Sequence, residues 1–112
     1  MSLNTPLTVP KSAVLNIEGV LTANPGSKLF DHDGYVDISN GGNMILNAVD
    51  TVGINFTMYS GGTLTIGRSG RLVADIGGSY LKVPVGGFLI NNGNLRVNTN
   101  LFINEGTLTN NN

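Results

Sequence analysis

The chain has 112 residues, of which only 12% are charged, and its six Lys and Arg and seven Asp and Glu give a formal net charge of −1. Because it contains no cysteine, it can form neither a disulfide framework nor a Cys-based metal site. Six scattered cations do not supply the basic surface that nucleic-acid binding needs, and no apolar run approaches the length of a membrane span. We therefore expect neither nucleic-acid binding nor membrane insertion.

One spacing organises the sequence: a glycine followed two positions later by an apolar residue. A turn residue thereby leads repeatedly into a short alternating segment, which predicts many short β-strands and almost no helix. The core must be aliphatic, since tryptophan is absent and only 6% of the residues are aromatic. The glycines that we interpret as structural turns are Gly19, Gly34, Gly42, Gly62, Gly70, Gly87, Gly93 and Gly106.

In chain order, residues 1–12 form an extended N-terminal arm, since Pro6 and Pro10 cannot donate to a strand ladder. Residues 13–112 are interpreted as a single all-β domain. Its expected strands lie at 14–17, 20–23, 29–30, 35–38, 44–46, 54–58, 63–66, 72–74, 80–83 and 88–90. The last stretch is an internal repeat with a period of 13 residues, in which 89–98 aligns without gaps on 102–111.

These features favour a short parallel β-solenoid, or β-helix, with coils of roughly 18–25 residues and four or five coils in all. Inward aliphatic side chains would stack from coil to coil. Glycine and asparagine would supply left-handed bends, and asparagine could also form hydrogen-bonded ladders. The alternative is an antiparallel β-sandwich or β-prism. Residues 42–47 and 93–98 resemble the repeats of monocot mannose-binding lectins, although the sugar-binding motif and the core tryptophan of that family are missing.

Two segments carry a second resemblance: Ile90-Asn91-Asn92-Gly93-Asn94-Leu95 and Ile103-Asn104-Glu105-Gly106-Thr107-Leu108. Over about a quarter of the chain, the sequence is similar to the Asn/Gly-rich repeats of β-helical proteins. These include filamentous-haemagglutinin-type proteins, autotransporter adhesin passengers, and phage tail-spike or fibre-like virion proteins. The resemblance implies a non-enzymatic structural protein. We expect a virion component, such as a capsid decoration, fibre or tail protein assembled in the host cytoplasm. The alternative is an extracellular or surface adhesin, or a carbohydrate-binding module that recognises a surface glycan.

Potential ligands gather only in Asp31-His32-Asp33-Gly34-Tyr35-Val36-Asp37. Asp31, Asp33 and Asp37 are the candidate metal ligands, but no further acid completes a calcium loop, and such residues are also typical of an exposed turn. His32 is the single histidine, and no Gly-x-Ser-x-Gly elbow accompanies it. We therefore expect no catalytic residue, no cofactor and no metal site.

Low charge and open solenoid ends predict self-association. We expect a trimer, an end-to-end assembly or a lattice, with other structural proteins as further possible partners. Thr63-Leu64-Thr65 and Thr107-Leu108-Thr109 are Thr-x-Thr pairs of the kind that ice-binding solenoids align. Two pairs do not make an array, so we interpret them as ordinary surface positions of strands.

Overall fold

The computed structural model describes residues 1–28, 34–51, 56–74, 81–97 and 102–111. Within these residues the structure has short strands and no helix. The strands are β1 (Ser2–Leu3), β2 (Val14–Ile17), β3 (Val20–Ala23), β4 (Tyr35–Ile38), β5 (Asn43–Leu46), β6 (Val49–Thr51), β7 (Phe56–Met58), β8 (Thr63–Ile66), β9 (Arg71–Ala74), β10 (Leu81–Val83), β11 (Phe88–Asn91), β12 (Asn94–Val97), β13 (Phe102–Asn104) and β14 (Thr107–Asn110).

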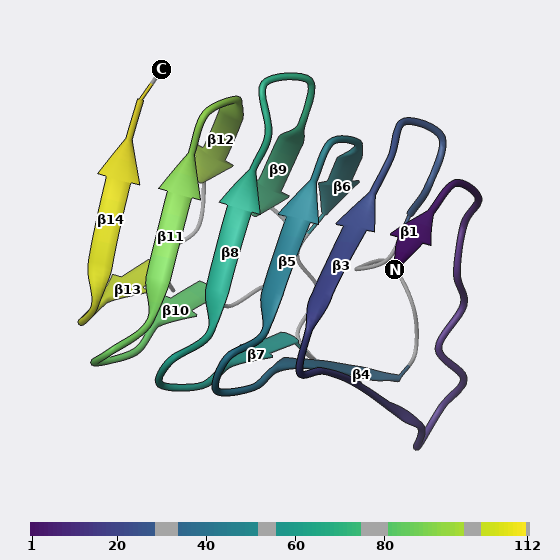
Figure 1. Cartoon of the computed structure of the whole chain (residues 1–112), viewed down its shortest axis with the longest axis horizontal. Coiled ribbons are helices and arrows are strands. Elements are labelled where there is room, and N and C mark those ends of the chain that lie inside the picture. The colour runs from purple at the N-terminus through teal and green to yellow at the C-terminus, as the bar shows by residue number, and fades with distance from the viewer. Residues whose placement is uncertain (29–33, 52–55, 75–80, 98–101, 112) are drawn as a thin grey trace.

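All strand pairs are parallel, and the chain winds repeatedly through three sides (Figure 1). The front sheet has the order β1-β3-β5-β8-β11-β14, and the rear sheet has the order β12-β9-β6. The lower side consists of β2-β4-β7 and of β10-β13, with β10 beside β7. This is a parallel β-solenoid of about four turns, as the sequence predicted. The antiparallel sandwich or prism is wrong, because no described strand pair is antiparallel.

The strand register gives the length of each coil. In the front sheet Leu21 pairs with Met44, Met44 with Leu64, Leu64 with Leu89, and Leu89 with Leu108. Successive partners are therefore separated by 23, 20, 25 and 19 residues along the chain. The expected coil length is confirmed, and its irregularity explains why the sequence shows no constant period.

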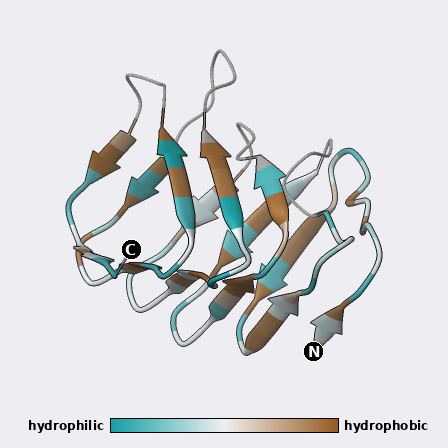
Figure 2. Ribbon diagram, turned by 90° about the horizontal axis from the view of Figure 1, so that it is seen from above, coloured by the Kyte–Doolittle hydropathy of each residue, from teal (hydrophilic) through white to brown (hydrophobic). Residues whose placement is uncertain are grey.

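The core consists of inward side chains at alternate strand positions, and Figure 2 shows hydrophobic and hydrophilic residues alternating within the strands. In β8, for example, Leu64 and Ile66 are fully buried, whereas Thr63 and Thr65 face outward. Full burial of one such aliphatic side chain stabilises the fold by about 1.5–3 kcal/mol. The fully buried apolar residues are Ala23, Val36, Ile38, Met44, Leu46, Leu64, Ile66, Leu72, Leu81, Val83 and Leu89.

The N-terminal arm covers one end of the solenoid. Its strand β1 pairs with β3, and its residues Leu3 and Val9 are buried in the core. The backbone N–H of Leu7 donates to the carbonyl of Lys28 at 3.0 Å, and the N–H of Gly34 donates to the carbonyl of Val9 at 2.9 Å. The arm is thus tied to the first coil at several points and shields the coil's edge.

The 13-residue repeat does not relate neighbouring coils. Leu89 is in register with Leu108, and Phe102 is in register with Leu81, so the aligned residues 89 and 102 lie on different sides of the solenoid. What repeats is a corner between two strands, first from β11 to β12 and then from β13 to β14. Because these two corners share one residue pattern but lie at different corners of the solenoid, the sequence shows a period that is shorter than one coil.

Candidate assembly surfaces

Glycine has two separate structural roles at the corners. Three of the five turns that lead from the lower side to the front sheet, those after β4, β7 and β10, are four residues long, and Gly42 N–H donates to the Ser39 carbonyl at 2.9 Å in the first of these three. Their third residues have a positive φ of 82° at Gly41, 82° at Gly61 and 78° at Gly86. These turns stack, because Gly41 N–H donates to the Gly61 carbonyl at 3.0 Å and Gly61 N–H to the Gly86 carbonyl at 2.8 Å. Such a φ is accessible to glycine at little cost.

The glycines of the Gly-x-apolar spacing are needed for a different reason. None of these eight has a positive φ, so the left-handed glycine bends that we expected lie at other positions, such as Gly41, Gly61 and Gly86. A Cβ at most of them would instead collide with the neighbouring coil. At Gly42 it would meet the carbonyl oxygen of Ile17, and at Gly70 that of Leu46. Gly34, Gly62, Gly87, Gly93 and Gly106 are similarly crowded, whereas Gly19 has no atom within 4 Å of the Cβ position.

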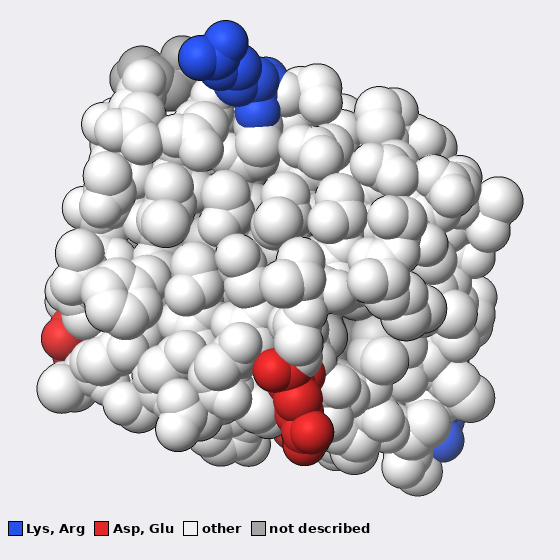
Figure 3. Space-filling view, viewed as in Figure 1, with Lys and Arg blue, Asp and Glu red and all other residues white. Residues whose placement is uncertain are grey.

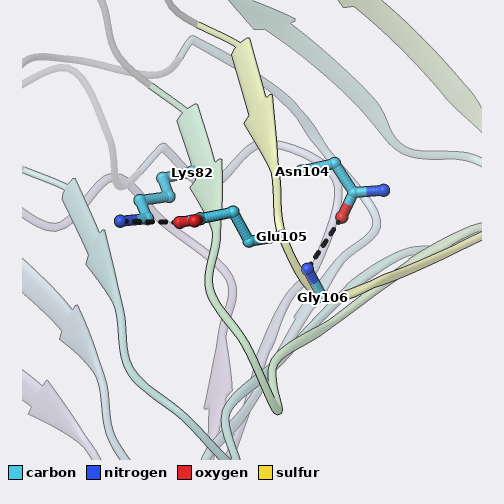
Figure 4. Close-up of polar contacts among 4 residues, drawn as sticks. All are labelled: Lys82, Asn104, Glu105 and Gly106. Carbon is cyan, nitrogen blue, oxygen red and sulfur yellow. Dashed lines mark hydrogen bonds and ion pairs between the residues drawn. The ribbon is translucent and has the colours of Figure 1, made fainter.

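Asparagine acts through its side chain rather than its backbone. No described asparagine has a positive φ, so the expected left-handed asparagine bends are not found in this part of the chain. Asn91 Oδ1 accepts a hydrogen bond from the Gly93 N–H at 3.1 Å, and Asn104 Oδ1 accepts one from the Gly106 N–H at 3.2 Å (Figure 4). Each bond closes a tight corner by mimicking a backbone turn.

Asparagine also forms a short ladder between the last two coils. Asn91 Nδ2 donates to Asn110 Oδ1 at 3.0 Å, and Asn111 Nδ2 donates to Asn92 Oδ1 at 2.7 Å. Asn91 is buried directly above the apolar position of Ile66, so its amide requires these partners. The ladder fixes the register of β14 on β11.

The candidate metal site falls largely outside the described residues, which contain neither Asp31, His32 nor Asp33. Asp37 lies on β4, in register with Asn16 and Thr57 on the outer lower side, and partial burial raises the pKa of its carboxyl group. Among the residues that the structure describes, no group of three or more His, Cys, Asp or Glu could hold a metal ion.

Sequence reasoning missed a second carboxyl group. Asp50 is only 1% exposed, and its position on β6 pairs with the core residue Leu72 on β9. A buried carboxyl group needs polar partners, and Asp50 has such a partner. Strand β6 begins at Val49, directly after a short corner. Only this starting point, which the sequence does not show, indicates that Asp50 rather than Val49 faces inward.

The last described coil differs from the coils before it in its exposure. All four residues of β14 are exposed, and Leu108, at the inward position above the buried Leu89, is 39% exposed. Phe102 and Leu95 are only partly buried against the core. An ion pair, Lys82 Nζ to Glu105 Oε1 at 2.9 Å, ties the corner of this coil to β10 (Figure 4). This end of the solenoid therefore presents apolar surface and an edge strand.

The outer face of the front sheet carries no charged side chain. Register places its outward residues in two columns that run across the strands, and Figure 3 shows this face almost entirely white. By contrast, Arg71 and Arg96 project from the rear sheet, and Asp37 and Lys82 from the lower side. The two columns are Val20, Asn43, Thr63, Phe88 and Thr107, and Ser2, Thr22, Ile45, Thr65, Ile90 and Thr109.

An open depression of about 560 Å³ lies where the front sheet turns into the rear sheet near the N-terminal arm. Its described lining includes Pro6, Lys28, Asn47 and Ser69 and contains no carboxylate. In the described part of the chain no helix is long and apolar enough to cross a membrane.

No protein-family description, curated protein or solved structure shows significant similarity to the chain. The fold places the chain among β-helical repeat proteins in general, and its geometry alone defines this class.

Proposed function

We propose that this chain is a non-enzymatic structural protein that associates with itself, and that it serves as a virion component such as a capsid decoration, fibre or tail protein. The observation that carries the proposal is the contrast between the two ends of the solenoid. The virion assignment rests on the resemblance of residues 88–112 to β-helical repeats of such proteins.

The two edges of the front sheet differ in protection. Strand β1 has only two residues and is followed by the proline-bearing arm, which packs over the first coil. Strand β14 has four residues without charge or proline, and in the described part of the chain no strand pairs with its outer edge. Edges of soluble sheets are normally blunted by charge, proline or short length. An edge without these features is suited to pairing with another strand.

The capped N-terminal end determines which partner geometry is possible. Head-to-tail stacking would bring the β14 edge against the arm, which already occupies the opposite end. Two β14 edges can instead meet about a two-fold axis normal to the front sheet, so that β14 pairs antiparallel with its copy. The same rotation brings β13 of one copy opposite β12 of the other. We therefore propose an end-to-end dimer with an isologous contact.

Light scattering over a wide concentration range tests this proposal. Leu108→Lys places a charge in the exposed apolar end and should weaken end-to-end dimerisation by about tenfold or more. Leu108→Ala should have a smaller effect, and Val85→Lys, in a turn at a residue that is 71% exposed, should have none. Far-UV circular dichroism checks that each variant is folded. A chain that stays monomeric at every concentration contradicts the proposal.

The alternative function, a surface adhesin or carbohydrate-binding module, predicts a different result. A glycan array would then show saturable binding that persists in the Leu108→Lys variant. Under the virion proposal, the array shows no binding, and the neighbouring genes encode capsid or tail proteins rather than a secretion partner.

A further inference from the structure

Asparagine followed directly by glycine occurs twice in the sequence, at Asn40-Gly41 and at Asn92-Gly93. Such a pair is prone to spontaneous deamidation, because glycine has no side chain to hinder attack by its own backbone nitrogen. That nitrogen, after losing its proton, bonds to the side-chain Cγ of the asparagine, and the amide nitrogen leaves as ammonia. Water then opens the cyclic imide, so the residue becomes aspartate or isoaspartate and acquires a negative charge.

The folded chain holds the Asn92-Gly93 junction in a conformation that opposes this reaction. The N–H of Gly93 donates to Asn91 Oδ1 at 3.1 Å, which engages the nitrogen that would attack. The side-chain amide of Asn92 is also held, because its Oδ1 accepts from Asn111 Nδ2 at 2.7 Å. Gly93 is buried against the coil beneath it, where a Cβ atom would collide with the Gly67 carbonyl oxygen. Ring closure therefore requires this corner to open first.

The groups that hold this junction belong to the last described coil or depend on it. Asn91 Nδ2 donates to Asn110 Oδ1 at 3.0 Å, and this bond fixes the amide so that its Oδ1 faces the Gly93 N–H. The N–H of Asn111 donates to the Asn91 carbonyl at 2.8 Å. All four residues of β14 are exposed, and an element with so little buried surface separates at a low free energy. Its separation removes the bond to Asn92 and the support of Asn91 together.

The other pair, Asn40-Gly41, lies between inner coils. The Gly41 N–H donates to the backbone carbonyl of Gly61 at 3.0 Å, so no side chain is needed to engage this nitrogen. Strand β5, which follows the turn, is paired on both edges, with β3 and with β8. Opening this turn would separate coils whose inward residues, such as Met44, are fully buried. Asn40 therefore provides an internal reference, with the same chemistry but a different protection.

We propose that Asn92 is a modification site at which the chain deamidates spontaneously, and that Asn91 and the last coil together set the rate. The product carries a new charge beside Asn111, and isoaspartate also lengthens the backbone at the corner between β11 and β12. Because ammonia is lost, the change is permanent, and it marks each chain whose last coil has opened. The inference is independent of the proposed self-association, since every contact that it uses lies within one chain.

Mass spectrometry of tryptic peptides measures deamidation at both sites during incubation in a mildly alkaline buffer. Peptide 83–96 contains Asn92, peptide 29–68 contains Asn40, and fragmentation assigns the modified residue within each. In the folded original chain, Asn92 should deamidate several-fold faster than Asn40, whereas in the guanidinium-unfolded chain the two rates should be similar. Asn91→Ala should accelerate the reaction at Asn92 by about three- to tenfold, as the loss of one hydrogen bond predicts, and leave Asn40 unchanged.

Asn24→Ala is the matched control, because it removes a side-chain bond between two asparagines, Asn24 Nδ2 to Asn4 Oδ1 at 2.9 Å, at the opposite end of the solenoid. It should change neither rate. Asn111→Ala is a second variant with a milder change, and it should also accelerate deamidation at Asn92 alone. Equal acceleration at Asn40 and Asn92 would show that Asn91 acts only through global stability and would overturn the proposal. An unchanged rate at Asn92 in folded Asn91→Ala and Asn111→Ala chains would overturn it as well.

Discussion

Replacing Gly70 by alanine should destabilise the solenoid, because the coil beneath it leaves no room for a Cβ atom. That Cβ would press on the carbonyl oxygen of Leu46, which already accepts a hydrogen bond from the Gly67 N–H at 2.7 Å. Overpacking costs about 1–3 kcal/mol, and weakening one backbone hydrogen bond costs about 1 kcal/mol more. We expect a loss of about 2–4 kcal/mol, or roughly 10–15 °C in Tm for a chain of this size.

Gly19→Ala is the matched control. Gly19 also belongs to the Gly-x-apolar spacing and lacks a positive φ, but no atom lies within 4 Å of its Cβ position. Alanine should stabilise the chain there by about 0.4–1 kcal/mol, because it restricts the unfolded state. Urea unfolding followed by far-UV circular dichroism measures both changes. Equal shifts for the two variants would refute the explanation by coil-to-coil contact.

Three further predictions concern the corners and the lower side. Gly41→Ala should cost about 1–2 kcal/mol and Gly41→Asn less, since asparagine tolerates a positive φ better, and urea midpoints would show the order. Asn91→Ala should cost about 1–3 kcal/mol, because it removes the Asn91 acceptor of the buried Gly93 N–H, whereas Asn104→Ala at an exposed corner should cost less than about 1 kcal/mol. Similar losses in the two variants would contradict this reasoning. Burial raises the pKa of Asp37 above 3.8, so the folded state binds its proton more tightly than the unfolded state does. Stability should therefore fall as the pH rises from 3.8 through the folded pKa, and Asp37→Asn should remove this component from a plot of unfolding midpoint against pH.

Local sequence patterns favoured the parallel solenoid over the antiparallel alternative, and the structure decided between the two. Alternation in segments such as 63–66 shows which side chains face inward, and glycine spacing shows where the strands must end. Both signals depend on neighbouring residues, which a single sequence displays directly. They also placed the length of a coil correctly, because three short sides and their corners leave little freedom in its size.

The parts that could not be predicted all depend on register between coils. Gly41 and Gly42 are adjacent in sequence. Only the stacked structure shows that Gly41 adopts a positive φ and that Gly42 avoids a clash with the neighbouring coil. The inward position of Asp50 likewise follows from its pairing with Leu72. Because the coils differ in length, no constant period in the sequence gives this register. The uncharged face was hidden for the same reason, since its members are about 20 residues apart along the chain.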